Sequence, residues 1–293
     1  MIMIIPYILA IIALLSWGIS PLIYKPFIGN LTGIRANALK NNFAAILGIV
    51  IGVGYMYSLS TLDELTILAV IIATIMNVIL GDIFFLEAIK RGGVSIGTPV
   101  SYTFQIFVLI FSWLFLREIP TLFSIVGAFL VVLGIFLTSY SFRDVKDKLM
   151  GVVCGLIAAF IWGLGLTIYG MMLRAQLPPE IVVMIRGFVI LAIYGPYAAI
   201  LMKNYKISAK SFVMLNIGGV FGILVGSIAY YYAIYLSGNI GAITVIASAS
   251  PVIGFVGSQI IYKDERTSNI PRLGYFGVVL VLMGILLTSL GGV

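Results

Sequence analysis

The chain has 293 residues, of which 62% are hydrophobic and only 9% are charged, and its mean hydropathy is +1.20. A soluble globular protein carries about 25% charged residues, so this composition excludes an ordinary soluble enzyme and favours a lipid bilayer as the surroundings. The net charge of +7 is not gathered into any Lys/Arg-rich run, and we therefore expect no nucleic-acid partner.

Apolar stretches of the length that spans a bilayer follow one another along the whole chain. A spanning helix needs about 20 mostly apolar residues, and these stretches lack the polar alternation of barrel strands. In chain order they cover about 2–24, 38–57, 65–88, 94–116, 121–140, 149–173, 181–202, 211–236, 240–262 and 272–291. The pattern predicts an all-α integral membrane protein with ten transmembrane helices.

The chain is an internal duplication. Residues 130–139 (LVVLGIFLTS) recur as 280–289 (LVLMGILLTS), and Trp17-Gly18 recurs 145 residues later as Trp162-Gly163. We therefore expect two five-helix repeats, 1–145 and 146–293. Because five is an odd number of spans, the repeats must cross the membrane in opposite directions. Inverted repeats of this kind are typical of transporters with a binding site between the two halves.

Basic residues are concentrated on the connections of one side of the membrane. That side holds Lys25, Arg35, Lys40, Lys90, Arg91, Arg143, Lys146, Lys148, Lys203, Lys206, Lys210, Lys263, Arg266 and Arg272. The other side holds Arg117 and Arg174, with Arg186 inside the seventh span near that face. The positive-inside rule then predicts a multi-pass protein of the plasma (inner) membrane with both termini outside the cell.

Several short motifs recur in a set order. Trp17-Gly18 and Trp162-Gly163 come late in the first helix of each repeat, and Arg117-Glu118 ends the fourth helix. Pro251 is followed by Asp264-Glu265 at the end of the ninth helix, and the closing helix of each repeat carries two spaced glycines, Gly127 and Gly134 in the first and Gly277 and Gly284 in the second. With these motifs the chain resembles a ten-helix permease of the drug/metabolite transporter superfamily, EamA type. The resemblance implies a central cavity lined by helices 1, 3, 4, 6, 8 and 9.

The repeats also differ from each other within that pattern. Phe104 stands in the first repeat where the second has Pro251. The basic residue that the family often carries in the second helix of a repeat is Arg186 in the second half. Its counterpart in the first half is either Arg35 or Lys40.

Asp82 is the acid placed deepest in an apolar stretch, about eight residues before Lys90-Arg91. A carboxylate at such a depth costs roughly 2.5–3.5 kcal/mol and usually faces a cavity or a partner. Asp82 is therefore either a substrate-amine contact or proton-coupling group, or a structural ion pair with Lys40 or another helix. Glu87 is the second proton-coupling candidate, with an interfacial ion pair to Lys90-Arg91 as its alternative.

A polar stripe runs along the fourth span, where Thr98, Ser101, Tyr102 and Gln105 are spaced 0, 3, 4 and 7. Polar side chains at this depth must face protein or water, so the stripe predicts either a cavity wall or interhelical hydrogen bonds. The other candidate substrate contacts come from the remaining central helices, with simple packing as the alternative for each aromatic ring. They are Trp17, Asn77, Trp162, Tyr169, Tyr230, Tyr231 and Ser248.

These features predict a secondary transporter that moves a small organic solute by alternating access, and the resemblance implies export of metabolites such as amino acids. The sequence has no P-loop, which leaves protons as the candidate driving ion and uncoupled facilitation as the alternative. The chain has no histidine, a single cysteine (Cys154) and no carboxylate cluster, which argues against an intramembrane enzyme, a metal site or a cofactor. The expected partners are the lipid bilayer and a small-molecule substrate, and the sequence leaves the oligomeric state open.

An exchanger of phosphorylated sugars or nucleotide sugars is the runner-up. Such a substrate would need two or more basic side chains facing the cavity. Lys40 and Arg186 are the candidates, and both are expected near the ends of their helices. That placement argues against the phosphorylated substrate.

Overall fold

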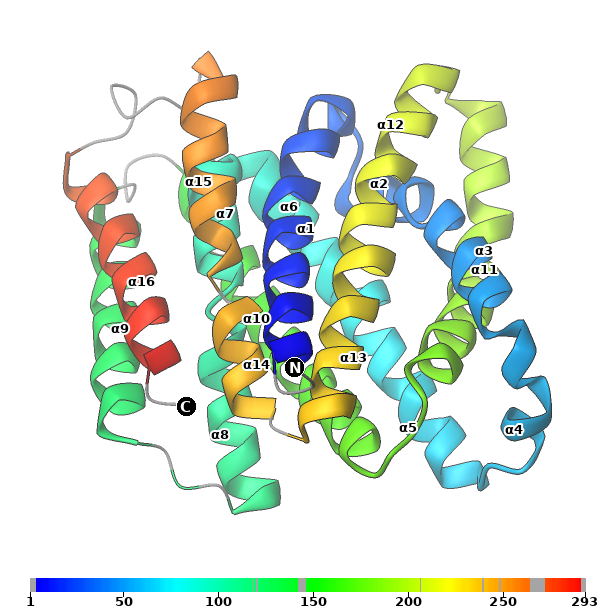
Figure 1. Cartoon of the computed structure of the whole chain (residues 1–293). Coiled ribbons are helices and arrows are strands. Elements are labelled where there is room, and N and C mark those ends of the chain that lie inside the picture. The colour runs from blue at the N-terminus through cyan, green and yellow to red at the C-terminus, as the bar shows by residue number, and fades with distance from the viewer. Residues whose placement is uncertain are drawn as a thin grey trace.

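The computed structural model describes residues 4–117, 119, 121–141, 146–205, 207–238, 240–247, 249–263 and 272–290, and these residues form a bundle of helices (Figure 1). The first half contains α1 (Ile5–Ile28), α2 (Gly33–Lys40), α3 (Asn42–Gly52), η2 (Val53–Tyr55), α4 (Met56–Ser60), α5 (Glu64–Thr74), η3 (Ile75–Gly81), α6 (Asp82–Gly92), α7 (Val94–Ser101), α8 (Phe104–Leu116) and α9 (Leu122–Ser141). The second half contains α10 (Lys146–Arg174), α11 (Pro179–Asn204), α12 (Ala209–Gly219), η4 (Val220–Gly226), α13 (Ser227–Ser237), α14 (Ile240–Ala247), α15 (Ser250–Ile261) and α16 (Arg272–Leu290).

Seven helical segments among the described residues are long and apolar enough to cross a membrane. They are Ile5–Ile28, Gly33–Ser60, Glu64–Gly92, Val94–Phe115, Lys146–Arg174, Pro179–Asn204 and Ala209–Ser237. Three shorter apolar helices cover Ile125–Leu137, Ser250–Ile261 and Arg272–Leu287. The chain is thus a multi-pass, all-helical membrane protein, while the number of ten crossings stays a prediction.

Equivalent N-cap residues begin the third membrane span of each repeat. Asp63 caps α5 by accepting a hydrogen bond from the backbone N–H of Thr66 at 2.9 Å. Ser208, 145 residues later, caps α12 by accepting from the N–H of Ser211 at 3.1 Å. Such caps satisfy a backbone donor that the first helical turn leaves free. The third span therefore begins at the equivalent residue in both repeats.

In both of these spans the α-helix changes to a wider π-helix at the equivalent position of the repeat. Ile75–Gly81 (η3) and Val220–Gly226 (η4) are seven-residue π segments offset by 145 residues. The next rod of each repeat is interrupted as well, between α7 and α8 and between α14 and α15. π segments and broken helices leave backbone carbonyls free for other partners and occur often at functional sites.

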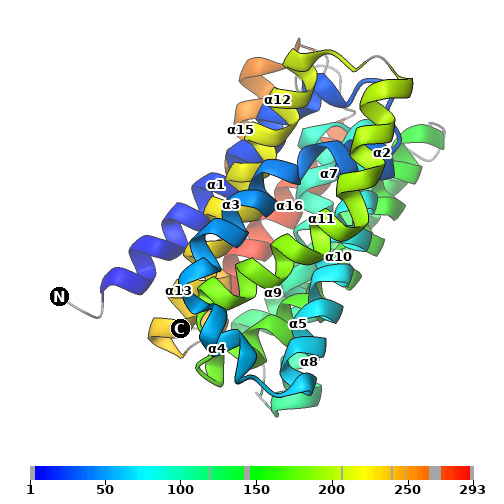
Figure 2. The ribbon, with the colours of Figure 1, turned by 90° about the vertical axis from the view of Figure 1, so that its right-hand side faces the viewer.

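The two repeats are interlocked rather than placed side by side. Helix α1 packs against α12, η4, α13 and α15 of the second half, whereas α10 packs against α5, η3, α6, α7 and α8 of the first half. In Figure 1 the blue α1 stands in the middle of the bundle, beside the yellow and orange helices of the second repeat. Figure 2 shows the opposite contact, with α3 crossing beside α11.

The glycines expected to pack the closing helices do so. A Cβ atom on Gly134 would lie 2.5 Å from the carbonyl oxygen of Gly277, and one on Gly284 would lie 2.5 Å from that of Gly127. Such close approach is the usual role of small residues between membrane helices. Because Gly134 faces Gly277 while Gly127 faces Gly284, α9 and α16 run antiparallel. That direction is the one expected for inverted repeats.

The second span starts earlier than its apolar stretch. We expected it over about 38–57, but the helical rod begins at Gly33 and bends between α2 and α3. The polar residues Asn37 and Lys40 hid this first part from a hydropathy reading, yet they are 0% and 3% exposed. They are tolerated because the protein interior, not lipid, surrounds them.

Candidate functional site

A cavity of about 80 Å³ lies where the two repeats meet. Its walls come from α1, α2, η3, α6, α8, α10, α11, η4 and α13. The wall residues are Trp17, Ser20, Tyr24, Lys40, Asn77, Val78, Asp82, Phe85, Tyr102, Phe104, Trp162, Leu166, Arg186, Gly222, Ile223, Ser227 and Tyr231. An apolar, aromatic lining with a few charged groups is typical of a small-molecule site.

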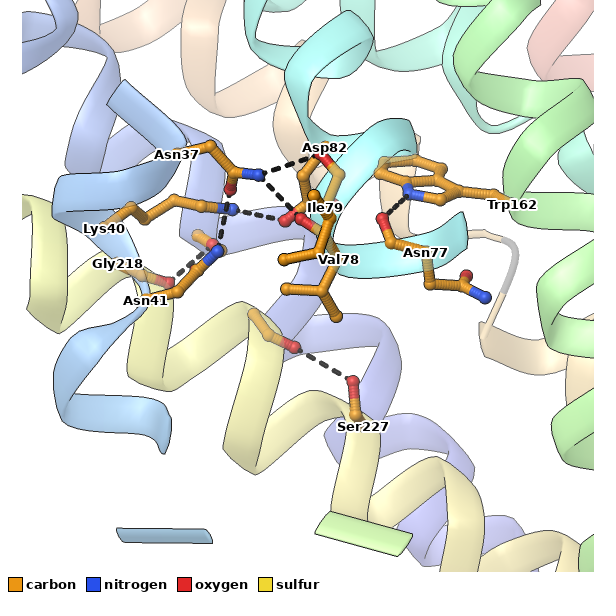
Figure 3. A network of polar contacts seen from close by, with 12 residues as sticks. Asn37, Lys40, Asn41, Asn77, Val78, Ile79, Asp82, Trp162, Gly218 and Ser227 are labelled. Carbon is orange, nitrogen blue, oxygen red and sulfur yellow. Dashed lines mark hydrogen bonds and ion pairs between the residues drawn. The ribbon is translucent and has the colours of Figure 1, made fainter. Parts of the chain in front are cut away.

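Lys40 and Asp82 form an ion pair in this wall, with 2.7 Å between Lys40 Nζ and Asp82 Oδ2. Their side chains are 4% and 5% exposed, so the pair is screened from solvent. Figure 3 shows the lysine reaching from α2 to the first residue of α6. The structural alternative for Asp82 is therefore present, and the carboxylate still borders the cavity.

Arg186 is also buried, at 4% exposure, and lines the same cavity. Its Nη1 donates to the hydroxyl of Tyr231 at 2.6 Å, and the guanidinium lies 5.4 Å from the ring centre of Tyr231 and 5.7 Å from that of Tyr169. The sequence placed Arg186 near the membrane face, but the structure places it in the protein interior, because α11 begins at Pro179, seven residues before it.

Of the two candidate counterparts of Arg186 in the first repeat, Lys40 is the one that shares the cavity wall with it. Both side chains border the cavity, 146 residues apart. Arg35 lies elsewhere, donating from Nη2 to the hydroxyl of Tyr205 at 2.7 Å on the outside of the bundle. The expectation that their placement keeps Lys40 and Arg186 out of the cavity was wrong, because both side chains line it, although Lys40 is the last residue of α2. Their placement therefore no longer argues against a phosphorylated substrate.

A side chain of the second repeat holds Lys40 in place by bridging the bend between α2 and α3. In a regular helix the N–H of Phe43 would bond to the carbonyl of Leu39. Instead the N–H of Phe43 donates to Asn216 Oδ1 at 2.9 Å, and Asn216 Nδ2 donates to Leu39 O at 2.7 Å. The amide satisfies both groups while keeping them apart. The bend turns Lys40 toward Asp82.

A second amide fixes the π segment η3 against α2. Asn37 Nδ2 donates to the carbonyl of Val78 at 2.6 Å and lies 3.0 Å from the Tyr194 hydroxyl. Asn41 Nδ2 in turn donates to Asn37 Oδ1 at 2.7 Å (Figure 3). These contacts position η3, which directly precedes Asp82. Asn37 and Asn41 thus hold in place the segment that leads into Asp82, from outside the cavity wall.

The paired tryptophans face the cavity from opposite repeats. Trp17 Nε1 donates to the carbonyl of Gly222 at 3.0 Å, and Trp162 Nε1 donates to the carbonyl of Asn77 at 3.1 Å. Both acceptors lie in π segments, at positions 145 residues apart. The glycines beside the tryptophans, Gly18 and Gly163, approach the carbonyls of Ser250 and Phe104 at the helix breaks of the other repeat.

The polar stripe of the fourth span does not face the cavity as one unit. Its spacing assumed a continuous helix, but α7 ends at Ser101 and α8 begins at Phe104. Of the four stripe residues, Tyr102 lines the cavity, whereas Thr98, Ser101 and Gln105 are packed in the interior. Within the described chain, Thr98 Oγ1, Ser101 Oγ and Gln105 Nε2 have no hydrogen-bond partner. Neither expected role is seen for these three atoms.

The other candidate contacts divide between the cavity wall and its support. Trp17, Asn77, Asp82, Tyr102, Trp162 and Tyr231 are in the wall. Tyr230 supports Trp17 at 5.1 Å between ring centres, and Tyr169 supports Tyr231 at 5.2 Å. Glu87 lies outside the cavity wall and accepts from Arg91 and from the N–H of Gly33. Ser248, like Glu118, Asp264 and Glu265, lies outside the described residues.

Sequence reasoning missed part of the wall, notably Ser20, Tyr24 and Phe85. Ser20 and Tyr24 follow Trp17 by three and seven residues, which puts them on the same face of α1. Ser20 Oγ donates to Gly218 O at 2.7 Å, and Tyr24 is 1% exposed. The helical spacing from Trp17 was the signal that could have found them. Phe85 stands three residues after Asp82 and packs 4.8 Å from Trp162.

Comparison with known proteins agrees with this architecture. The sequence is 24% identical over 283 residues to a protein of Archaeoglobus fulgidus named an uncharacterized transporter, covering 96% of this chain and 98% of that one. It is 29% identical to a Listeria monocytogenes protein whose name proposes sugar uptake, covering 94% and 95% of the two chains.

A solved crystal structure shares the fold, with a TM-score of 0.64 at 15% identity over 97% of this chain and 96% of that one. The sequence model of the EamA-like transporter family matches residues 4–140 and again 149–290. The two matches correspond to the two repeats and together cover almost the whole chain. The chain therefore belongs to the EamA-like transporter family.

Proposed function

We propose that this transporter carries a small organic solute, in the first instance an amino acid, through the cavity by alternating access. The observation that carries the proposal is the cavity itself, which lies where the two interlocked repeats meet and holds charged groups of both signs. Each repeat can adopt the conformation of the other, so that the cavity opens first to one side of the membrane and then to the other. An amino acid offers both charges and an apolar side chain.

We further propose export as the physiological direction, from an inner membrane in which both chain termini face outward. The basic connections support this orientation through the positive-inside rule. Asp82 is the proposed proton-coupling group, because its carboxylate borders the cavity and protonation would release Lys40. A monomer would contain the complete cavity.

Sugar uptake is the second candidate function. It is favoured by the name of the Listeria monocytogenes relative and by the rings of Trp17 and Trp162, whose faces can stack on the apolar face of a sugar. A neutral sugar would leave the charges of the cavity as they are.

Uptake of a radiolabelled panel into proteoliposomes tests these proposals. The panel contains amino acids and neutral sugars, each measured with and without a proton gradient. Saturable uptake of an amino acid, driven by the gradient, would support the first proposal. Saturable uptake of sugars alone would favour the second. If neither class moves, the amino-acid and sugar proposals both fail.

A further inference from the structure

The charges of the cavity wall do not balance. The wall contains three ionised side chains, the cations Lys40 and Arg186 and the single carboxylate of Asp82. Asp82 is engaged by Lys40 at 2.7 Å. Two cations against one carboxylate leave one positive charge in the wall, and that charge belongs to Arg186.

The hydrogen-bond and ring partners of Arg186 among the described residues are neutral. Its hydrogen bond goes to the hydroxyl of Tyr231, and its guanidinium stands over the rings of Tyr169 and Tyr231. The described ion pairs do not include Arg186, and its Nε, buried from solvent, has no hydrogen-bond partner in the described chain. A buried charge without a counterion is costly, and an arginine binds a planar carboxylate with two parallel hydrogen bonds.

We propose that Arg186 binds an anionic group of the transported solute, and that this group is a carboxylate. The inference rests on the proposed transport function and narrows its substrate to organic acids and amino acids. One unpaired cation matches one negative charge. A phosphate ester, which carries about two charges near neutral pH, would leave an excess negative charge because Lys40 is already held by Asp82.

The rest of the wall fits the organic part of such a solute. Trp17, Phe85, Tyr102, Phe104 and Trp162 form an aromatic surround, and Leu166 adds an aliphatic side chain. Within this surround Tyr231 orients the guanidinium through its hydroxyl. The geometry thus assigns the anion to the Arg186 side of the cavity and the apolar portion of the solute to the space between the tryptophans.

Binding of three matched probes to the detergent-solubilised full chain tests the inference. Isovalerate, isovaleramide and isobutyl phosphate share one branched alkyl group and differ in the charge of their head. Binding is followed by the fluorescence of the cavity tryptophans at constant ionic strength. We expect isovalerate to bind about tenfold more tightly than isovaleramide and more tightly than isobutyl phosphate. Equal binding of acid and amide, or no saturable binding of isovalerate, would overturn the proposal, and tighter binding of the phosphate would overturn the choice of carboxylate.

Variants locate the effect at Arg186. R186Q should reduce the preference for isovalerate over isovaleramide to about unity, and R186K, which keeps the charge but not the planar fork, should give an intermediate value. The control R35Q, outside the cavity wall, should keep the full preference. A preference retained in R186Q, provided that its thermal unfolding and that of R186K match the wild type, contradicts the inference. If R186Q does not fold, the R186K value decides, and an unchanged preference there contradicts it equally.

Transport separates this inference from the proposed function. If wild-type proteoliposomes move neither amino acids nor sugars, the proposed function fails whatever the probes show. If they move a neutral sugar, and R186Q moves it equally well while no carboxylate competes, transport stands and the carboxylate inference is lost.

Discussion

Trp17 and Trp162 stand at equivalent positions in the two repeats, and each donates its indole N–H to a backbone carbonyl in the π segment of the other repeat. The contact therefore joins the halves twice, related by the internal symmetry. Each indole also borders the cavity, so that movement of one repeat against the other would displace part of the cavity wall. The tryptophan of each Trp-Gly motif thus connects the two repeats, a contact called the joint below, and also lines the cavity.

Replacing these tryptophans should reduce transport more than it reduces thermal stability. Trp17→Phe and Trp162→Phe each remove one hydrogen bond, which within a membrane protein contributes about 0.6 kcal/mol. We expect a small loss of thermal stability in detergent, a larger loss of transport, and a double variant whose effect on transport is not the sum of the two. Trp113→Phe is the control because this tryptophan is 52% exposed and lies away from the joint. Unchanged transport in both single variants would contradict this interpretation.

Gly81 and Gly226 provide the space for the indoles. A Cβ atom at Gly81 would lie 2.4 Å from Trp162 Cδ1, and one at Gly226 would lie 2.4 Å from Trp17 Cδ1. Gly81→Ala should therefore displace the indole and destabilise the protein by about 1–3 kcal/mol in a detergent unfolding assay. Gly195→Ala is the matched control, because nothing lies within 4 Å of the added atom and alanine favours the helix. Equal stability of the two variants would refute the steric argument.

Removing one partner of the Lys40–Asp82 pair should reduce the stability of the protein more than removing both. Asp82→Asn leaves a buried ammonium without its counterion, and we expect a loss of about 3–5 kcal/mol in stability. Lys40→Met combined with Asp82→Leu removes both charges and should recover most of that loss. Arg91→Gln is the surface comparison, since its pairs are partly exposed and should contribute less than about 1 kcal/mol. A double variant no more stable than Asp82→Asn would argue against this account.

Proton coupling through Asp82 has its own test. If Asp82 carries the proton, Asp82→Asn should lose the response of uptake to a proton gradient while keeping exchange of solute across the membrane. The measurement compares gradient-driven uptake with exchange in the same proteoliposomes. Glu87→Gln serves as the comparison, because Glu87 pairs with Arg91 outside the cavity wall. A gradient response that survives in Asp82→Asn and disappears in Glu87→Gln would transfer the role to Glu87.

Asn216 should control the bend in the second span. In Asn216→Leu the groups of Leu39 and Phe43 lose their bridging partner, and we expect a loss of about 1–3 kcal/mol in stability together with reduced transport. Asn204→Leu, at an exposed position near the end of α11, should stay within about 0.5 kcal/mol of the wild type. Transport and stability equal to the wild type in Asn216→Leu would show that the bend forms without the bridge.

The orientation in the membrane can be read from two cysteines. Ser60 and Lys203 are exposed, at the end of α4 and near the end of α11, which lie at opposite ends of the bundle (Figure 1). In a Cys154→Ser background we expect a membrane-impermeant maleimide to label Ser60→Cys in whole cells and to leave Lys203→Cys unlabelled until the cells are opened. The reverse pattern would place the termini inside.

The sequence alone determined the class of protein, the duplication and the positions of most apolar rods. Hydropathy and repeated motifs are properties of neighbouring residues, and a bilayer permits few alternatives to helices. The same reading identified Trp17, Asp82 and Trp162 as cavity candidates, because the tryptophans recur at equivalent positions of the two repeats and a carboxylate at such a depth usually faces a cavity or a partner.

Tertiary structure decided how those residues meet. The partner of Asp82, the inward position of Arg186 and the break after Ser101 depend on contacts between residues far apart in the chain. Asn216 bends a helix some 170 residues before it, which no local pattern predicts. The positive charge left in the cavity wall becomes evident only from the structure. Which charges neutralise each other, such as Lys40 and Asp82, depends on which residues are neighbours in space.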